Sequence, residues 1–409
     1  MNKKTIKDLG DIKGKRIFVR ADLNVPQNEK GKIMDDNRIR ESLATLTYLL
    51  KKGARVILCS HLGRPKGKEE IWSLKPVAKR LQALLPHAPI TPGVMVPLYK
   101  VIMAKDCIGP EVEAQVAKLK NGQILLLENI RFYKEETDND PEFTKKLANL
   151  ADIYVNDAFG TAHRAHASTE GIAHYLPAVA GLLMEKEIDI LGKAIQNPKR
   201  PLVVIIGGKK IADKMPVIDN LLNLANTIII GGGMTYTFIK AQGGNVGKSI
   251  VDDSKIDYCK GVIKAAKEKG VNLLLTVDTV AADKFANDAN KKIVDIFNVP
   301  DGWEGLDIGP KTIERIKAAL VGSGTIIWNG TLGVNEFENF IVGTREVAKA
   351  IGAATAKGAI TIVGGGDSAA AVAHLKLTKK FTHISTGGGA SLEMLEGKIL
   401  PGVAALNNK

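Results

Sequence analysis

Short apolar runs that end in glycine or polar residues recur along the chain, and they alternate with segments of helical periodicity. Runs of this kind are typical of parallel strands covered by helices on both faces. They form two series: residues 16–26, 55–65, 123–132 and 152–160, then residues 201–208, 226–233, 271–280, 324–333, 359–368 and 381–389. The two series predict an α/β protein with two doubly wound, Rossmann-like parallel-sheet domains.

The length of 409 residues fits two or three domains. We expect an N-terminal domain over residues 1–180, an interdomain helix and hinge over 181–200, a C-terminal domain over 201–390, and a segment over 391–409 that packs back on the N-terminal domain. The boundary rests on AVAGLLMEKEIDILGKAIQNPKRP, which is typical of an amphipathic helix followed by proline breakers. An ordinary surface helix fits the same periodicity.

The net charge of +13 is unevenly distributed, since residues 1–100 hold 21 Lys and Arg against 9 Asp and Glu, a net charge of +12. A basic first segment fits nucleic-acid binding. Aromatic residues make up only 5% of the chain, however, and they are not interleaved with the basic residues as stacking on single strands requires. We therefore expect no nucleic-acid partner, and interpret the charge as attracting small anionic metabolites.

The three cysteines, Cys59, Cys107 and Cys259, have neither CxxC nor metal-site spacing. An odd number of widely separated cysteines indicates a reducing compartment and thiols that act as small core residues. No apolar run has the length of a membrane span, and the first ten residues, MNKKTIKDLG, lack the apolar part of a signal peptide. We expect a cytoplasmic protein without a membrane partner.

Anion-binding residues follow the strands of the first series. They are Asp22 and Asn24 after the first strand, His61 and Arg64 after the second, Arg131 after the third, His163, Arg164 and His166 after the fourth, and Arg38 at the start of a helical segment. Arginine offers a rigid pair of donors to phosphate or carboxylate. Taken alone, each arginine is better explained by a surface salt bridge than by a role in anion binding. Together, at strand ends that share one sheet edge, they predict an anion site.

Glycine-rich loops follow the strands of the second series. GGKKIADK (207–214) is expected to enter a helix with Lys210 and Lys214 on one face, which favours a phosphate at the helix N-terminus. The alternative is a glycine turn followed by solvated lysines. GGGMTYTF (231–238) lacks the spacing of a dinucleotide fingerprint, and GGNVGKS (243–249) is one residue short of a P-loop.

Two carboxylates in these loops have distinct expected roles. Glu336 is able to accept hydrogen bonds from ribose hydroxyls, and Asp367 in GGDS is the candidate for Mg²⁺, or else a helix N-cap. No spacing typical of a nucleophile with its base stands out. Phosphoryl transfer fits this pattern, because positioning and charge neutralisation suffice for it.

The ordered motifs VRADLNVP, SHLGRP, LLENIRF, NDAFGTAHRAHAST, IIIGGGM, GWEGLDIGP, VGGGDS and HISTGGGASLEMLEGKILPGV resemble phosphoglycerate kinases nearly from end to end. The resemblance implies a glycolytic and gluconeogenic kinase. It would transfer a phosphoryl group reversibly between 1,3-bisphosphoglycerate and MgADP, giving 3-phosphoglycerate and MgATP. Transfer would be direct and in line, on closure of the two domains, with Mg²⁺ accompanying ADP or ATP and with the protein as a monomer.

The resemblance also implies the site residues. The glycerate ligand would be bound by the N-terminal domain through Asp22, Asn24, Arg38, His61, Leu62, Gly63, Arg64, Arg131 and Arg164. The nucleotide would be bound by Lys210, Lys214, Gly232, Gly305, Asn329, Gly330, Leu332, Glu336, Gly365, Gly366, Asp367 and Ser368, with Asp367 on Mg²⁺. The transferring group would be stabilised by Arg38, Lys210 and the backbone amides around Gly366 and Gly388.

Three positions depart from the family pattern. Lys209 stands where the family usually has Ala or Ser, Thr331 replaces a usual proline, and Asn335 replaces a usual phenylalanine before Glu336. None of these changes removes a charged ligand. They bear on nucleotide affinity and on the rigidity of the loops.

Two rival functions are an NAD-dependent dehydrogenase and a non-catalytic basic binding protein. A dehydrogenase needs a ribose-binding carboxylate at the right distance after its glycine fingerprint, and it needs a hydride-transfer partner, and the motifs place neither. A binding protein leaves the ordered glycine loops without a role.

Overall fold

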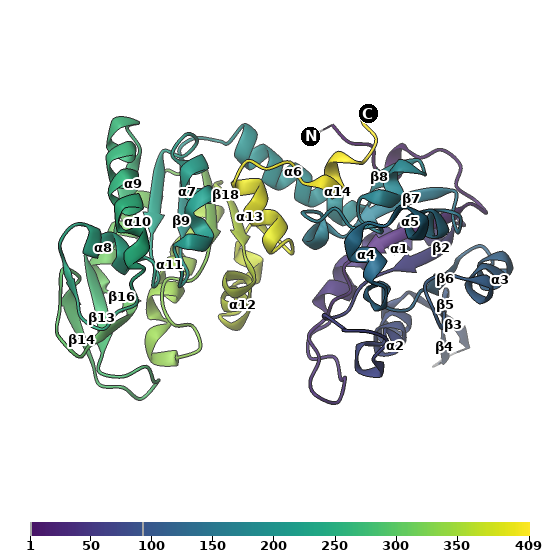
Figure 1. The fold of residues 1–409 in the computed structure, drawn as a ribbon, viewed down its shortest axis with the longest axis horizontal. Helices are drawn as coiled ribbons and strands as arrows, with labels where there is room; N and C mark the ends of the chain where they lie inside the picture. The colour runs from purple at the N-terminus through teal and green to yellow at the C-terminus, as the bar shows by residue number, and fades with distance from the viewer. Residues whose placement is uncertain (1, 92–93) are drawn as a thin grey trace. The chain divides into compact units, whose positions relative to one another are not determined.

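The computed structural model describes residues 2–91 and 94–409. The chain forms two compact units, of which unit 1 comprises Met1–Asp189 with Ile399–Lys409 and unit 2 comprises Ile190–Lys398. Figure 1 shows both units as strands flanked by helices. The expected α/β class with two doubly wound parallel sheets is confirmed. The ligands assigned to each domain stay predictions.

Unit 1 contains a six-stranded sheet in the order β5-β6-β2-β1-β7-β8, in which every strand pair is parallel. Its strands are β1 (Arg16–Ala21), β2 (Arg55–Cys59), β5 (Lys100–Met103), β6 (Gln123–Leu126), β7 (Ile153–Asp157) and β8 (Ala178–Ala180), and β3 (His87–Thr91) pairs with β4 (Val94–Pro97) separately. The helices are α1 (Asn37–Lys51), α2 (Lys75–Leu84), α3 (Pro110–Lys118), α4 (Lys134–Asp138), α5 (Pro141–Ala148) and α14 (Pro401–Ala404), and α6 (Leu182–Gln196) runs on into unit 2.

Unit 2 contains a second parallel sheet in the order β12-β10-β9-β17-β18-β19. Its strands are β9 (Leu202–Ile206), β10 (Thr227–Ile230), β12 (Asn272–Leu274), β17 (Thr325–Asn329), β18 (Ile360–Gly364) and β19 (His383–Ile384). The helices are α7 (Met215–Leu221), α8 (Thr235–Ala241), α9 (Ile256–Glu268), α10 (Pro310–Leu320), α11 (Val342–Ala356), α12 (Gly366–His374) and α13 (Gly389–Leu395).

A small antiparallel sheet lies at one end of unit 2 (Figure 1). It joins β14 (Lys291–Asp295), β13 (Asp278–Ala282) and β16 (Glu304–Ile308), and the short strands β11 (Asn245–Val246) and β15 (Asn298–Val299) pair nearby. The single strand expected over 271–280 is therefore wrong. The run divides into β12 and β13 because the nitrogens of Val277 and Asp278 donate to the Thr312 hydroxyl, at 3.0 and 3.2 Å, instead of continuing the parallel ladder.

The segment expected to be one helix from Ala178 begins instead with strand β8, which pairs with β7. Strand and helix meet at Gly181, where an added Cβ would lie 2.1 Å from an Asp157 carboxylate oxygen. The first amide groups of α6 are satisfied by side chains from other elements, since Leu182 donates to Thr45 and both Leu183 and Met184 donate to Asp157. The start of α6 is thus fixed to β7 and α1 within unit 1.

The last residues of the chain pack on unit 1. The Gly402 nitrogen donates to the Ala162 carbonyl at 2.8 Å, and the Asn156 amide donates to the Gly402 carbonyl at 3.1 Å. The Lys4 nitrogen donates to the Asn407 carbonyl at 2.8 Å. Figure 1 shows this yellow segment, with α14, beside β8. Residues 391–398, by contrast, belong to unit 2.

The three cysteines are free thiols within the two cores. Burial raises the pKa of Cys59 and of Cys259 to about 12 and raises that of Cys107 as well, so each stays protonated at neutral pH. Among the helices of the described residues, we find none that combines the length and apolar character needed to cross a membrane.

We predict that Asp157→Asn changes how stability depends on pH. Burial raises the pKa of Asp157 to about 6, so the carboxyl contributes most below its unfolded pKa of about 3.9, and this contribution is lost as pH rises through the folded value. The free energy of unfolding of the wild type relative to the variant should fall by about 2 kcal/mol between about pH 4.5 and 7 and then level off. Urea unfolding at a series of pH values measures this.

Asp152→Asn is the matched control. Its side chain accepts hydrogen bonds from Arg16, which lowers the pKa of Asp152. The stabilisation from this ion pair is present above the unfolded pKa, so the difference from wild type should stay flat over the same range. A flat difference for Asp157→Asn as well would contradict the prediction.

Candidate functional site

The predicted anion-binding residues of unit 1 follow four neighbouring strands, β6, β2, β1 and β7. Because all four strands are parallel, the loops that leave their carboxyl ends share one edge of the sheet. The loop after β2 is held to the loop after β1, since the Gly63 nitrogen donates to the Asn24 side chain at 2.8 Å. The loop after β6 is held to the same place, since Arg131 donates to the Gly63 carbonyl at 2.8 Å.

Gly63 is at the centre of these contacts, and its conformation explains why glycine is needed there. Its φ is +62°, and an added Cβ would lie 2.3 Å from the Trp72 ring. The preceding Leu62 is buried, and both of its backbone polar groups bond to the Asn129 side chain, at 3.2 and 2.7 Å. The HLGRP loop is thereby held through its backbone groups, and the Arg64 side chain takes no part in these contacts.

Arg38 and Arg64 are two accessible cations of this cluster. Arg38, in the first turn of α1, forms an ion pair with Asp22, and 36% of its side chain remains exposed. Arg64 is exposed and has no ion pair among the residues the structure describes. Both side chains are therefore available to an anion.

Positive charge at this edge exceeds negative charge. Burial, with Arg20 and Arg164 nearby, lowers the pKa of Arg131 to about 10. Burial together with Arg131, Arg164 and Arg20 lowers the pKa of His166 to about 4. Mutual repulsion among cations is relieved when an anion binds among them.

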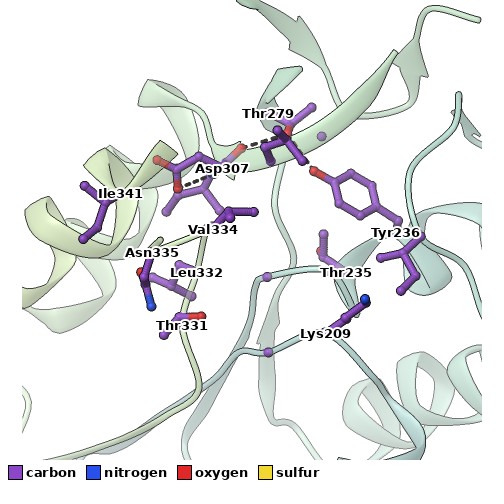
Figure 2. A pocket seen from close by; sticks show the side chains of 18 of the residues that line it. Lys209, Thr235, Tyr236, Thr279, Asp307, Thr331, Leu332, Val334, Asn335 and Ile341 are labelled. Atoms are coloured by element: carbon purple, nitrogen blue, oxygen red, sulfur yellow. Dashed lines mark hydrogen bonds between the residues drawn. The ribbon is translucent and has the colours of Figure 1, made fainter. Parts of the chain in front are cut away.

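Unit 2 has a cavity of about 940 Å³ over the carboxyl ends of its strands (Figure 2). Of the residues expected to bind nucleotide, the ones that line it are Gly232, Gly305, Leu332, Glu336 and Asp367. Lys210, Lys214, Asn329, Gly330, Gly365, Gly366 and Ser368 are not part of this lining. Gly388 caps α13, also outside it.

Four of these residues outside the lining form a connected group beside the cavity. Lys214 donates to the Asn329 side chain, and the Gly330 nitrogen donates to the Ser368 hydroxyl at 2.7 Å. Burial lowers the pKa of Lys214, and the Asp367 carboxylate, which lines the cavity, opposes that shift. The group therefore joins the loop after β17 to the start of α12.

The loops themselves touch backbone to backbone. A Cβ added at Gly232 would lie 2.6 Å from the Gly208 nitrogen and 2.7 Å from the Thr331 carbonyl oxygen. The Gly208 nitrogen donates to that carbonyl at 3.0 Å. Glycine is required here so that the loops after β9, β10 and β17 come together.

The expected helical placement of Lys210 and Lys214 is wrong. Residues 207–211 are not helical, Ala212–Lys214 forms a 3₁₀ turn, and α7 begins at Met215. The reason is Pro216, which fits the first turn of a helix and cannot lie farther inside one. Lys209 and Lys210 lie in the loop before the helix, and both are exposed.

All three residues expected to depart from the family pattern line the cavity. Figure 2 shows the side chains of Lys209, Thr331 and Asn335 among the lining residues. The Asn335 side-chain oxygen is buried, and no donor in the described part of the chain reaches it. These three substitutions make the cavity wall more polar.

One side of the cavity is formed by residues that were not predicted from the sequence. Tyr236 and Thr279 share a hydroxyl–hydroxyl bond of 2.7 Å, and the Thr279 hydroxyl donates to the Asp307 carbonyl at 2.8 Å (Figure 2). The Asp307 carboxylate accepts from the nitrogens of Ile308 and Gly343, and burial raises the pKa of Asp307 to about 7. A usable signal was Asp278, an acid in the largely apolar run of residues 271–280.

Within the described residues we find no group of three or more His, Cys, Asp or Glu side chains that could hold a metal ion by itself. Asp367 is a single exposed carboxylate in the first turn of α12, on the cavity wall. Mg²⁺ is commonly held by one or two carboxylates together with substrate phosphates and water. Asp367 fits that kind of site and not an all-protein cage.

A family model described as "Phosphoglycerate kinase" matches residues 6–398. A cytosolic phosphoglycerate kinase of Triticum aestivum is 56% identical over 408 residues, which are 99% of each chain, and a phosphoglycerate kinase of Nostoc sp. is 56% identical over the full length of both. Among solved structures, phosphoglycerate kinase from Coxiella burnetii is 38% identical with a TM-score of 0.86, and 98% of each chain is covered.

We predict that Gly305→Ala destabilises unit 2. An added Cβ would lie 1.7 Å from the Tyr236 hydroxyl and 2.7 Å from the Thr279 hydroxyl, both of which are buried. Overpacking of this kind costs about 1–3 kcal/mol of unfolding free energy. Denaturant unfolding followed by circular dichroism measures the change.

Gly261→Ala is the matched control, since Gly261 lies inside α9 and an added Cβ meets nothing within 4 Å. It should stabilise the protein by about 0.5–1 kcal/mol. Equal stability of Gly305→Ala and the wild type would show that the contact with Tyr236 is not close-packed.

Proposed function

The chain belongs to the phosphoglycerate kinase family, and we propose that it carries out this family's glycolytic phosphoryl transfer with the two residue sets described above. The reaction moves a phosphoryl group between 1,3-bisphosphoglycerate and MgADP. Its substrates are small molecules, namely phosphoglycerate and ADP or ATP. The observation that carries the proposal is the surplus of arginines at one sheet edge of unit 1, combined with a glycine-lined cavity in unit 2.

In this proposal unit 1 binds the phosphoglycerate. Its residues are Asp22, Asn24, Arg38, His61, Leu62, Gly63, Arg64, Arg131 and Arg164. The substrate carries a carboxylate and a phosphate, and arginine pairs with either group through two parallel hydrogen bonds. Asp22 orients Arg38 through their ion pair, so this cation is held in place before the substrate arrives.

Unit 2 binds the nucleotide in the same proposal. The base and ribose occupy the cavity, with Glu336 accepting from ribose hydroxyls, and the phosphates lie toward Lys210, Lys214 and the start of α12. The first amide groups of α12 have no partners within the helix and favour a phosphate oxygen. Asp367, in that turn, is the residue we assign to Mg²⁺, which neutralises phosphate charge when bound.

Arg38, Lys210 and the amides around Gly366 and Gly388 stabilise the transferring group. The loose transition state spreads charge over three oxygens, so donors aimed at those oxygens lower the barrier without a protein nucleophile. Direct in-line transfer brings together ligands bound to two separately folded units, and we therefore include domain closure in the proposal.

We also propose that the protein acts as a monomer in the cytoplasm. The curated relatives include cytosolic and chloroplastic enzymes as well as bacterial ones, so location is not common to the family.

A coupled assay tests the function. 3-Phosphoglycerate and MgATP are supplied, and the 1,3-bisphosphoglycerate formed is consumed by glyceraldehyde-phosphate dehydrogenase with loss of NADH absorbance. We expect turnover that requires both substrates and the added dehydrogenase. NADH oxidation without the added dehydrogenase would support the rival dehydrogenase, and absence of turnover would support a binding protein.

Arg38→Ala is predicted to lower kcat by about 100-fold or more, because a charge contact made mainly in the transition state is lost. The KM for ATP should change little. Arg40→Ala is the control, since Arg40 lies two residues farther along α1, is exposed and, among the residues the structure describes, pairs only with Asp36. Equal kcat values for the two variants, or an effect of Arg38→Ala confined to the KM for ATP, would remove Arg38 from the reaction.

Lys209→Ala is predicted to weaken MgADP binding by about 0.3–1 kcal/mol at low salt and by less at high salt, as for an exposed charge contact. Lys357→Ala, at the end of α11 and away from the cavity, is the control. Titration calorimetry in both salts measures the affinities. If Lys209→Ala and Lys357→Ala bind MgADP alike, Lys209 does not contact the nucleotide.

A further inference from the structure

Arg20 is buried in β1, directly below the anion-binding edge of unit 1. Only 1% of it is exposed, although the surrounding strand is apolar. Its Nε donates to the Ser168 hydroxyl at 2.8 Å, one Nη donates to the Ala21 carbonyl, and the other Nη lies 3.1 Å from Nδ1 of His61. A buried arginine with every contact fixed has a defined orientation, and one of those contacts reaches a residue of the proposed site.

The chemistry of arginine decides which atom of His61 carries a proton. A guanidinium has five N–H donors, no acceptor, and a charge that is not lost in proteins. The short contact with Nδ1 is therefore favourable only when Nδ1 offers its lone pair. A neutral imidazole that accepts at Nδ1 has its proton on Nε2.

We propose that Arg20 is a positioning residue that holds His61 as the neutral Nε2–H tautomer, so that His61 binds the anionic substrate as an uncharged donor and not as a cation. The proposal rests on the proposed function for the identity of that substrate. The tautomer itself is a property of the free protein and is tested without any ligand.

The charges around His61 support the neutral form. Only 3% of the residue is exposed. Burial is the largest cause that lowers the pKa of His61 far below its usual range, followed by Arg20, Arg131, Arg38 and Arg164. These cations belong to β1, to the turn after β6, to α1 and to the loop after β7. The nearby acids already have partners, since Asp22 pairs with Arg38.

Glu136 keeps Arg20 in place from below. It is fully buried, and it accepts from the Ser168 hydroxyl at 2.7 Å and from the Ser168 nitrogen at 2.9 Å. The Ser168 hydroxyl thus accepts from Arg20 and donates to Glu136. Burial raises the pKa of Glu136, and the charge of Arg20 opposes this shift. The charge of Glu136 offsets that of Arg20, so the guanidinium is free to orient His61.

Nε2 of His61 has no hydrogen-bond partner in the described residues, and it is not one of the buried polar atoms that lack a partner. This nitrogen therefore keeps contact with solvent and is available to donate to a carboxylate or phosphate oxygen. The arginines supply the charge of the site, and His61 supplies a directional bond that does not add to their repulsion.

The first test is the ¹⁵N spectrum of histidine-labelled wild-type protein without ligand, with the His61 signals identified by their loss in His61→Gln. We expect Nε2 protonated and Nδ1 unprotonated from about pH 5.5 to 8, against a usual histidine pKa of about 6.5. A proton on Nδ1, or titration of His61 within that range, would overturn the proposal whatever the protein catalyses.

The second test separates Arg20 from the burial of His61. Glu136→Gln alone keeps Arg20, and Arg20→Met with Glu136→Gln removes the arginine without leaving the acid charged and unpaired. We expect the single variant to retain the Nε2–H tautomer and the double variant to show Nδ1 protonation or a raised pKa. An unchanged tautomer and pKa in the double variant would overturn the role of Arg20. If the double variant does not fold, the wild-type spectrum still decides whether the tautomer exists.

The third test uses substrate. Glutamine places an amide N–H near the position of Nε2, and asparagine places it near Nδ1. We expect His61→Gln to keep the KM for 3-phosphoglycerate within about 3-fold of wild type, and His61→Asn to raise it about 10-fold or more, as for loss of one bond to a charged ligand. The ratio of the His61→Gln and wild-type KM values should stay constant from about pH 5.5 to 8, since substrate ionisation cancels in it. A ratio that rises as pH falls would show a cationic His61 and contradict the proposal.

Discussion

Parallel strand pairing is the constraint on which both ligand sets depend. Every strand of a parallel sheet ends at the same edge. Four loops of unit 1 therefore meet at one edge of its sheet, and four loops of unit 2 meet at one edge of the other sheet, although these loops are not adjacent in the sequence. That meeting requires close approach of backbones. Gly63 packs against Trp72, and Gly232 packs against Gly208 and Thr331, at distances that leave no room for a side chain. The close approach of loops at the sheet edge therefore requires these glycines as much as ligand binding does.

In the proposed function, the two units attract anions in different ways. Unit 1 concentrates arginine side chains, and it limits their repulsion with acids placed below and beside them, namely Glu136 under Arg20 and Asp22 next to Arg38. In the proposed function unit 2 offers backbone amide groups at loop ends together with Lys210 and Lys214. Its buried acids serve the protein itself, since Asp278 accepts from the first amide groups of α10. A concentrated set of arginines fits a small, highly charged acid. A glycine-lined cavity fits the larger, partly apolar nucleoside.

The fold class and most strand positions could be predicted from the sequence, because apolar runs ending in glycine mark strands strongly. The boundaries of helices and strands that are set by residues distant in the sequence could not be predicted. Thr312 ends the ladder of β12 and starts a second sheet, Asp157 fixes the first turn of α6, and Pro216 moves the start of α7 beyond the lysines. Arg64 and Arg131 were recognisable because they follow strands. Arg20 lies inside a largely apolar strand and Asp307 inside β16, and only their partners in space reveal a role.

In the proposed function the two substrates bind separate units, each through its own sheet edge. Hydrogen exchange of the full chain, with 3-phosphoglycerate alone and with MgADP alone, tests it most directly. The account predicts that 3-phosphoglycerate slows exchange in residues 60–65, 129–133 and 158–170, and that MgADP slows it in residues 207–214, 231–236 and 329–336. Protection of the unit 1 loops by MgADP alone, or of the unit 2 loops by 3-phosphoglycerate alone, would contradict it.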